Sequence, residues 1–303
     1  MSIPGRLAVL AAAAMLAAPA SAATAPPAAA PARDWAPTAQ ALGKAGAVQP
    51  DGGYRVPFPR SDLHVTLDGV TLKAGFALGG WVGFAPMGKD AMVMGDLVLA
   101  QDEVSPVMKS LSQNGFEITA LHNHLLRAEP MTLYMHVEGH GDAVKLAQAL
   151  HAALALSRTP FTSAAPTAPG GDLGIDAAAI DKTLGAKGKV NGGVLQYGIP
   201  RRAPVRDGGM VVPASLGSAI AINFQPTGEG RAAITGDFVL TADEVNPVLR
   251  ALQSNGIEVT ALHSHMLHEA PRVFFMHFWA NDEALKLARG LRAALDRAAV
   301  AAR

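Results

Sequence analysis

The chain has 303 residues, of which half are hydrophobic and 17% are charged. Its 25 basic and 25 acidic side chains balance to a formal net charge of zero, which argues against a broad basic surface for nucleic acid or an anionic membrane. Because the chain contains no cysteine, disulfides, thiolate metal ligands, a cysteine nucleophile and a lipid on an N-terminal cysteine are excluded.

The first 22 residues have the pattern of a secretory signal peptide. Arg6 supplies a positive charge, residues 7–18 form a short apolar run, and Ala20-Ser21-Ala22 fits a small-residue cleavage site. The run is too short for a typical membrane-spanning helix, and we expect no transmembrane segment in the mature chain. We therefore expect a periplasmic or secreted protein that is cleaved near Ala22; an uncleaved anchor is the alternative.

The remaining chain divides by composition into two repeats. Two stretches rich in proline and alanine, a leader and an internal segment, have the composition of extended connections. The predicted organisation is signal peptide 1–22, leader 23–37, first repeat 38–158, linker 159–171 and second repeat 172–303.

An internal duplication is the strongest pattern in the sequence. Residues 95–138 and 236–279 align without a gap and share 22 identities in 44 positions. A spacing of 141 residues is too long for a solenoid repeat, so it indicates two homologous domains.

Each repeat has the same predicted order of elements. In the first, we expect a helix near 36–45, strands at 54–58, 64–67, 76–84 and 91–99, a helix from about 102 to 114, a β-hairpin, and a final amphipathic helix. This order favours an α+β fold in which an antiparallel sheet carries helices on one face.

The hairpin of each repeat contains three histidines. They are His122, His124 and His136 in the first copy and His263, His265 and His277 in the second. Because side chains alternate along a strand, each His-x-His pair shares one face. If the first turn centres on Glu129, His122 lies opposite His136; the same register places His263 opposite His277.

Three neutral imidazoles with an open fourth position suit a catalytic divalent zinc ion. We therefore predict one metal site in each repeat, on the face turned outward or toward the other repeat. The expected ion is Zn²⁺. Copper is the alternative, because Met135, Met266 and Met276 lie nearby in the sequence and thioethers suit Cu(I). Packed or surface histidines with ordinary hydrogen bonds are the structural alternative.

Several carboxylates accompany the histidines. Glu138 shares the predicted histidine face and is a candidate additional ligand, while Glu129 and Glu269, in the hairpin turns, are weak candidates for a general base. Glu129 and Glu269 occupy non-equivalent positions, which weakens the catalytic interpretation. Asp96 and Asp237 each follow a glycine inside a predicted strand, where a structural role is favoured over a binding edge.

Three segments resemble one known family: PRSDLHVTLDGV, GDFVLTADEVNPVLRALQSNGIEVTALHSHML and FFMHFWAND. They are similar to the LppY/LpqO family of exported bacterial proteins, whose domain has no assigned function. The resemblance covers nearly the whole mature chain. It implies an exported protein with the domain in two copies, but it implies no reaction and no catalytic residues.

The pattern leaves three functions open. The chain is a metal-binding protein that acts as a metal-dependent hydrolase if it is an enzyme, a non-catalytic envelope module that binds a small molecule or a partner, or a protein that handles copper or zinc. No phosphate-binding loop, serine nucleophile elbow or His-Glu-x-x-His helix is present.

Export gives the first testable prediction. Protein recovered from the cell envelope should begin near Ala23, because the small-residue cleavage site ends at Ala22. N-terminal sequencing measures this directly. Intact Met1 on protein found only in the cytoplasm would contradict it.

Overall fold

The computed structural model describes Met1 and residues 33–162 and 173–301. The predicted signal peptide after Met1, most of the leader and most of the linker lie outside the described residues. The predicted domain boundaries therefore stay predictions. No helix among the described residues is long and apolar enough to cross a membrane.

The first repeat contains a six-stranded sheet in the order β1-β2-β5-β6-β8-β7. All of its neighbouring strands pair antiparallel. Its elements are α1 (Ala36–Leu42), β1 (Ala47–Val48), β2 (Tyr54–Pro59), β3 (Thr66–Leu67), β4 (Val70–Thr71), α2 (Ala74–Ala77), β5 (Gly79–Met87), β6 (Asp90–Ala100), α3 (Gln101–Gln113), β7 (Glu117–His122), β8 (Thr132–Gly141) and α4 (Ala143–Leu154).

The second repeat has the same order of strands in space, β9-β10-β13-β14-β16-β15. Its elements are α5 (Ala177–Leu184), β9 (Lys189–Asn191), β10 (Val194–Pro200), β11 (Arg206–Asp207), β12 (Met210–Val211), the 3₁₀ turn η1 (Ala214–Leu216), β13 (Ala219–Gly228), β14 (Arg231–Leu240), α6 (Ala242–Ser254), β15 (Glu258–His263), β16 (Phe274–Glu283) and α7 (Ala284–Leu295). The predicted α+β fold with two homologous repeats is confirmed.

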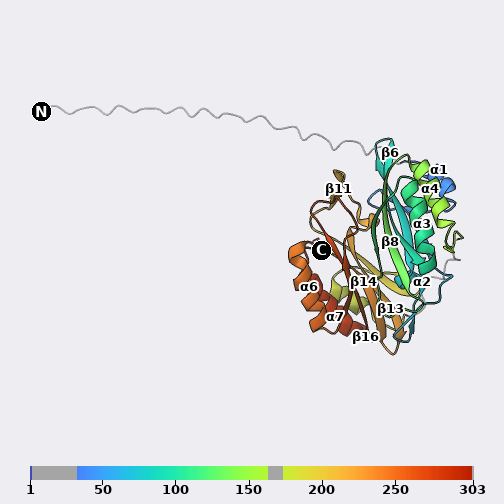
Figure 1. The fold of residues 1–303 in the computed structure, drawn as a ribbon. Helices are drawn as coiled ribbons and strands as arrows, with labels where there is room; N and C mark the ends of the chain where they lie inside the picture. Colours follow the sequence, from blue (N-terminus) through green and yellow to red (C-terminus); the bar gives the residue numbers. More distant parts are fainter. Residues whose placement is uncertain (2–32, 163–172, 302–303) are drawn as a thin grey trace. The chain divides into compact units, whose positions relative to one another are not determined.

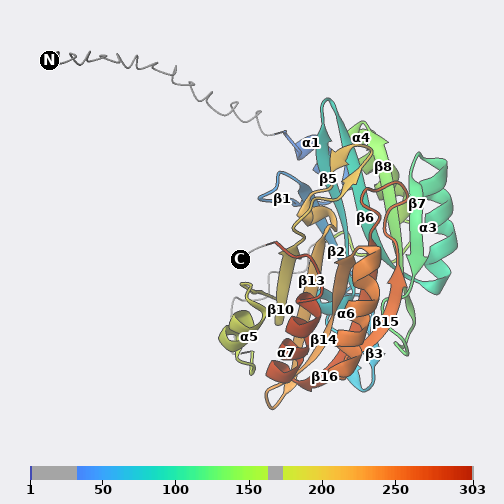
Figure 2. The same cartoon turned by 90° about the vertical axis from the view of Figure 1, so that its left-hand side faces the viewer.

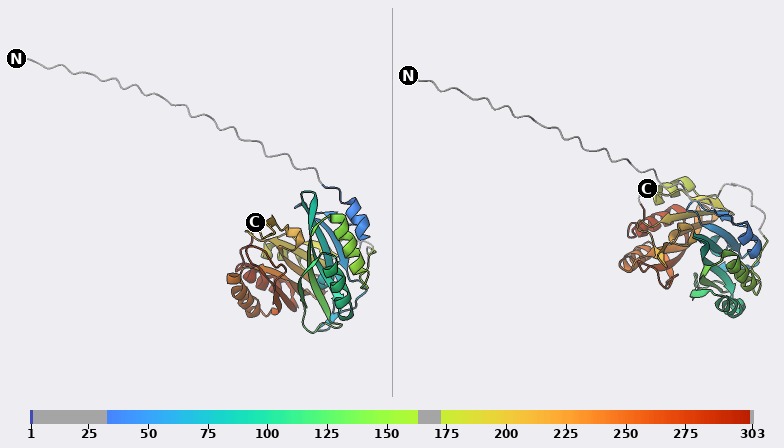
Figure 3. Two further views of the ribbon diagram at one scale, coloured as in Figure 1. Left: turned by 45° about the horizontal axis from the view of Figure 1, so that its top comes forward. Right: turned by 90° about the horizontal axis from the view of Figure 1, so that it is seen from above.

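The helices cover the outer face of each sheet. Helices α3 and α4 lie beside β6 and β8, and α6 and α7 lie beside β14 and β16, on the opposite side of the structure (Figures 1 and 3). Figure 2 shows α6 and α7 in front of the second sheet. The central strands β6 and β14 are buried along most of their length on both faces. Helices cover one face of these strands, and the opposite repeat covers much of the other.

Two sequence-based strand predictions were wrong. The segment predicted as a strand at 64–67 forms only the two residues of β3, which pair with β4 outside the main sheet. The strand predicted at 76–84 begins at Gly79, because residues 74–77 form the short helix α2. Both segments belong to a connection that reaches the other repeat.

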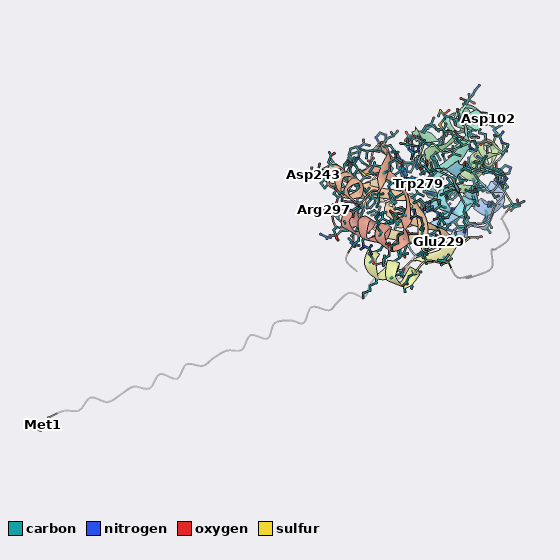
Figure 4. All side chains as sticks on the ribbon, turned by 90° about the horizontal axis from the view of Figure 1, so that it is seen from below. Met1, Asp102, Glu229, Asp243, Trp279 and Arg297 are labelled. Carbon is teal, nitrogen blue, oxygen red and sulfur yellow. The ribbon has the colours of Figure 1, made fainter. Side chains whose placement is uncertain are left out.

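That connection joins the repeats through Trp279. Its indole Nε1 donates to Asp68 Oδ2 at 3.0 Å, and its ring lies 6.2 Å from that of Phe76, edge to face. Arg127 bridges Asp68 and Glu258 with nitrogen–oxygen distances of 3.0 and 2.8 Å. Figure 4 places Trp279 between the two halves, whereas Asp102 and Asp243 lie at their outer sides. The repeats are thus held together by side chains of opposite halves.

A buried ion pair fixes the start of α3 and of α6. Arg60 Nη1 lies 2.7 Å from Glu103 Oε2, and Arg201 Nη1 lies 2.7 Å from Glu244 Oε2. Each glutamate also accepts a hydrogen bond from the backbone N–H just before its helix, which satisfies a donor that has no partner within the helix. Arg60 has a second carboxylate, that of Asp62, at 2.7 Å.

This difference gives a stability prediction. Glu244→Gln should lower the free energy of unfolding by about 3–5 kcal/mol, because it leaves Arg201 buried without a carboxylate. Glu103→Gln should cost less, because Asp62 still neutralises Arg60. Urea denaturation of the two variants at neutral pH measures the difference, and equal losses would contradict it.

The pH dependence of this pair follows from its hydrogen bonds. Burial raises the pKa of Glu244, but hydrogen bonds from Arg201 and from the backbone of Thr241 and Ala299 outweigh it and hold the pKa below its usual value. The stability from this carboxylate is therefore present above its ordinary pKa and is lost as the pH falls through the lowered value.

Candidate functional site

The predicted hairpin register was wrong by two residues. His122 lies opposite Tyr134, and His136 lies opposite Ala120. A bulge between Ile118 and Ala120 and the loop 123–131 set this register. Because the shift is even, His122 and His136 still share a face, with ring centroids 5.0 Å apart.

The second hairpin repeats this arrangement. His263 lies opposite Phe275 and His277 opposite Ala261, again after a bulge. His124 and His265 lie just beyond the strand ends, where their rings come within 4.9 and 5.0 Å of His122 and His263. The structure therefore brings each predicted trio together, although not through the predicted pairing.

The two trios also interlock across the repeat interface. Three ring pairs stack between opposite repeats: His122 with His263 at 3.5 Å, His124 with His277 at 3.8 Å, and His136 with His265 at 3.6 Å between centroids. A shift of 141 residues exchanges the two outer pairs and maps the central pair onto itself. This is the pattern of a local two-fold axis through the central pair. The histidine face is turned toward the other repeat.

Backbone contacts fix the tautomer of several rings. The Nδ1 atoms of His277 and His263 lie 2.9 and 3.1 Å from the carbonyl oxygens of Gly236 and Ser264. His122 makes a longer contact of 3.3 Å with the carbonyl of Asn123. A carbonyl only accepts, so Nδ1 carries the proton and Nε2 presents a lone pair.

The Nε2 atoms meet at the interface without donors. Within the described residues, the buried Nε2 atoms of His122, His124, His136 and His265 have no hydrogen-bond partner. His263 Nε2 and His277 Nε2 lie 2.8 Å apart. Since both of these rings are protonated at Nδ1, two lone pairs face each other at this distance. The arrangement requires a cation, because neither atom can donate.

The protein environment opposes protonation of these rings. Burial, and then the proximity of His263, lowers the pKa of His122 to about 3. Burial lowers the pKa of His263 to about 4, and it places the pKa of each of the other four rings well below the ordinary value. The rings are therefore neutral near pH 7, which is the form that ligates metals.

Two aspartates complete the cluster, and the sequence analysis favoured a structural role for them. Asp96 lies opposite His136 in the sheet and Asp237 opposite His277. His136 Nε2 is 3.9 Å from Asp96 Oδ1, and His265 Nε2 is 3.5 Å from Asp237 Oδ2. Their Oδ1 atoms have no partner among the described residues. The signal available in the sequence was their exact repetition beside the histidine strand.

Burial also acts on these carboxyls. It raises the pKa of Asp96 to about 7, although the charge of Arg55 opposes the shift. Burial, and then the charge of Asp96, raises the pKa of Asp237 well above its usual value. Two carboxylates in this position therefore also favour a nearby cation.

The structure places the other carboxylate candidates away from the imidazole nitrogens. Glu129 is exposed, and its backbone pairs with Thr66. Glu269 is buried and accepts from the backbone N–H of Val273 and from Arg272. Glu138 is buried, with its Oε1 3.6 Å from His140 Nε2. Burial, followed by the charge of Asp207, raises the pKa of Glu138 to about 7.

Two overlapping histidine groups have metal-binding geometry. His122, His124 and His136 form one, and His122, His263, His265 and His277 form the other; within each group the ligand atoms lie within 4.8 Å of one another. His122 belongs to both. The cluster is thus one centre shared by the repeats rather than two isolated hairpin sites.

A cleft of about 600 Å³ reaches this centre from outside. Asp96, Asp237, His124, His265 and His277 contribute to its lining. Its other residues come from both sheets, from α2 and from η1. A small molecule can therefore approach the centre through this opening.

The comparisons identify the family of the chain. It belongs to the family described as Domain of Unknown Function (DUF1259), whose model matches residues 36–156 and 178–297. This confirms the expectation of a domain without assigned function in two tandem copies. No curated protein matches the chain.

One solved structure is similar at a low level. It is described as a trimeric bacterial microcompartment shell protein, PduB, at 13% sequence identity, with 83% of this chain and 90% of that chain covered and a TM-score of 0.21. At this score the likeness supports no conclusion about this chain.

The depressed histidine pKa values predict a pH dependence for metal-free protein. Below about pH 6.5 the unfolded chain takes up protons at six imidazoles that the folded chain keeps neutral, so stability should fall as the pH falls. Each imidazole contributes a slope of up to about 1.4 kcal/mol per pH unit, until its folded pKa is reached. Chelator-treated protein unfolded in urea between pH 7.5 and 5 measures this slope.

Two variants separate the cluster from the rest of the chain. His124→Gln should reduce the slope by up to about 1.4 kcal/mol per pH unit, because it removes one such imidazole. His64→Gln should leave the slope unchanged, because His64 is exposed. Equal slopes for the two variants would show that burial does not keep the cluster neutral.

Proposed function

We propose that the histidine cluster binds two divalent metal ions between the repeats. His122, His124 and His136 hold one, and His263, His265 and His277 hold the other. The observation that carries this proposal is the meeting of unprotonated Nε2 atoms, above all those of His263 and His277 at 2.8 Å. A tetrahedral zinc ion with bonds of about 2.0–2.1 Å separates its nitrogen ligands by about 3.3 Å, so a small movement would admit it.

The donor set favours zinc or another divalent ion over Cu(I). Imidazole nitrogens with nearby carboxylates suit Zn²⁺, Cu²⁺ and Ni²⁺, whereas thioethers favour Cu(I). Met135 and Met276 are buried on the helix-facing side of their strands, where they join the two apolar cores. Met266 is buried in the core of the second repeat. These side chains give no support to a copper-handling role based on methionine.

The aspartates extend the proposed coordination. Asp96 and Asp237 sit beside opposite members of the cluster, with oxygens within 3.9 Å of His136 and 3.5 Å of His265. A bound cation would favour their ionised form and satisfy the Oδ1 atoms that have no partner. We therefore assign Asp96 and Asp237, rather than Glu138, as the carboxylates nearest to the metals.

The cleft favours a role in which the metals meet a small molecule, over storage alone. In a catalytic form of the proposal, the chain is a metal-dependent hydrolase and a metal activates water near the two aspartates. In a binding form, the metals anchor a ligand. We propose that this occurs outside the cytoplasm, as the signal-like N-terminus predicts.

Metal stoichiometry tests the proposal. Protein purified without a histidine tag should bind about two zinc ions per chain. His124→Ala should remove one ion and keep the other, because His124 belongs to one group only. His122→Ala should weaken both by about tenfold or more, because His122 belongs to both groups.

Matched substitutions provide the control. His64→Ala removes an exposed histidine, and Asn123→Ala removes a side chain that bonds to the Leu125 carbonyl between two proposed ligands. Both should bind zinc as the parent does in calorimetry and elemental analysis. Parent-like binding by His122→Ala, or no binding by the parent, would refute the assignment.

A further inference from the structure

The cleft has a symmetric floor and asymmetric walls. Asp96 and Asp237 occupy equivalent floor positions, but Trp81 pairs with Asp96 where Ala221 pairs with Asp237. On the neighbouring strands, Arg55 of the first repeat has Gln196 as its counterpart 141 residues later. All six residues line the cleft, together with His265. One wall therefore carries a cation on an aromatic ring, and the other carries a neutral amide and a methyl group.

Arg55 is held ready to bind an anion. Its guanidinium carbon lies 3.9 Å from the centre of the Trp81 ring, which fixes its plane. It donates to the carbonyl oxygen of Ser215, and this uses one of its five N–H donors. In residues 33–162 and 173–301, no carboxylate lies at ion-pair distance from it, because Asp51 is occupied by the N–H and hydroxyl of Ser215.

The charge of Arg55 persists in this position. Burial lowers the pKa of the guanidinium to about 10, while the charges of Asp96 and Asp51 oppose that shift. The side chain is therefore cationic near pH 7. Lys189 adds a second positive charge at the lining of the cleft.

The opposite wall leaves room for the body of a ligand. A Cβ atom added to Gly198 would meet nothing within 4 Å, and Gly198 lies beside Ala221 in the sheet. Glycine inside a strand often marks a place where a ligand approaches the backbone closely. Gln196 and Asn223 add amide groups to this side.

We infer that the cleft binds a small organic anion whose carboxylate or phosphate group pairs with Arg55, and whose body lies along Gly198 and Ala221 toward the histidine cluster. This inference names the ligand class of the proposed metal centre, and it rests on that proposal only for the contact with metal. Arginine suits both groups, since its fork of N–H donors matches the oxygens of either.

Calorimetry with succinate and inorganic phosphate tests the inference. Both probes are titrated into metal-free protein and into Co²⁺-loaded protein, with glycerol as an uncharged probe. We expect at least one anion to bind at millimolar concentration or below and glycerol not to bind. The preferred anion decides between a carboxylate and a phosphate ligand. Binding beside the metal should also shift the visible absorption bands of Co²⁺.

Two independent variants test the site. Arg55→Gln should weaken anion binding at least tenfold, and Gly198→Val should do the same by filling the space while it keeps Arg55. Arg55→Lys should recover part of the affinity. Arg250→Gln is the matched control, because it removes the same charge from an exposed position on α6.

The outcomes distinguish this inference from the metal proposal. Anion binding to metal-free protein that depends on Arg55 and Gly198 supports it even if no metal binds. Unchanged anion binding in both variants, or no binding of either anion to the parent, overturns it. The metal content of Arg55→Gln and Gly198→Val should equal that of the parent, so their loss of anion binding cannot be ascribed to loss of metal.

Discussion

The stacking of three imidazole pairs between two sheets is the constraint on which the rest of the site depends. Ring centroids 3.5–3.8 Å apart across the interface require both sheets to present their histidines at the same depth. The helices can then cover only the outer faces. Connections such as the segment that carries Asp68 must reach across to the other repeat to close the edges of the interface.

This interface is unusual because its centre is polar. Buried polar groups normally have hydrogen-bond partners, and unpaired ones cost about 1–3 kcal/mol each. Several Nε2 atoms and two carboxylate oxygens are unpaired here, while apolar cores of ordinary packing surround each sheet. The apolar cores supply stability that allows this polar centre to persist. A bound cation would remove its cost, so metal binding and folding of the interface should be thermodynamically linked.

The sequence predicted the elements better than their contacts. Amphipathic helices, alternating strands and a duplication of 141 residues follow from local periodicity, and they suffice for the fold class. The shared face of His122 and His136 depends only on strand parity, which an even shift of register preserves. The bulge at Ile118, the stacking on His263 and the approach of Asp96 depend on tertiary packing, which one sequence does not encode locally.

Duplication also explains why a symmetric centre can have a directional ligand site. A two-fold arrangement gives both repeats the same histidines and aspartates, so by itself it cannot orient an unsymmetrical molecule. Replacement of a few wall residues after duplication removes this equivalence without moving the floor. Arg55 and Trp81 on one side, with Gln196 and Ala221 on the other, provide charge at one end and space at the other. The same divergence gives Glu138 and Trp279 different partners at the edges of the interface. The conserved half of the duplication therefore builds the cluster, and the diverged half determines what can approach it.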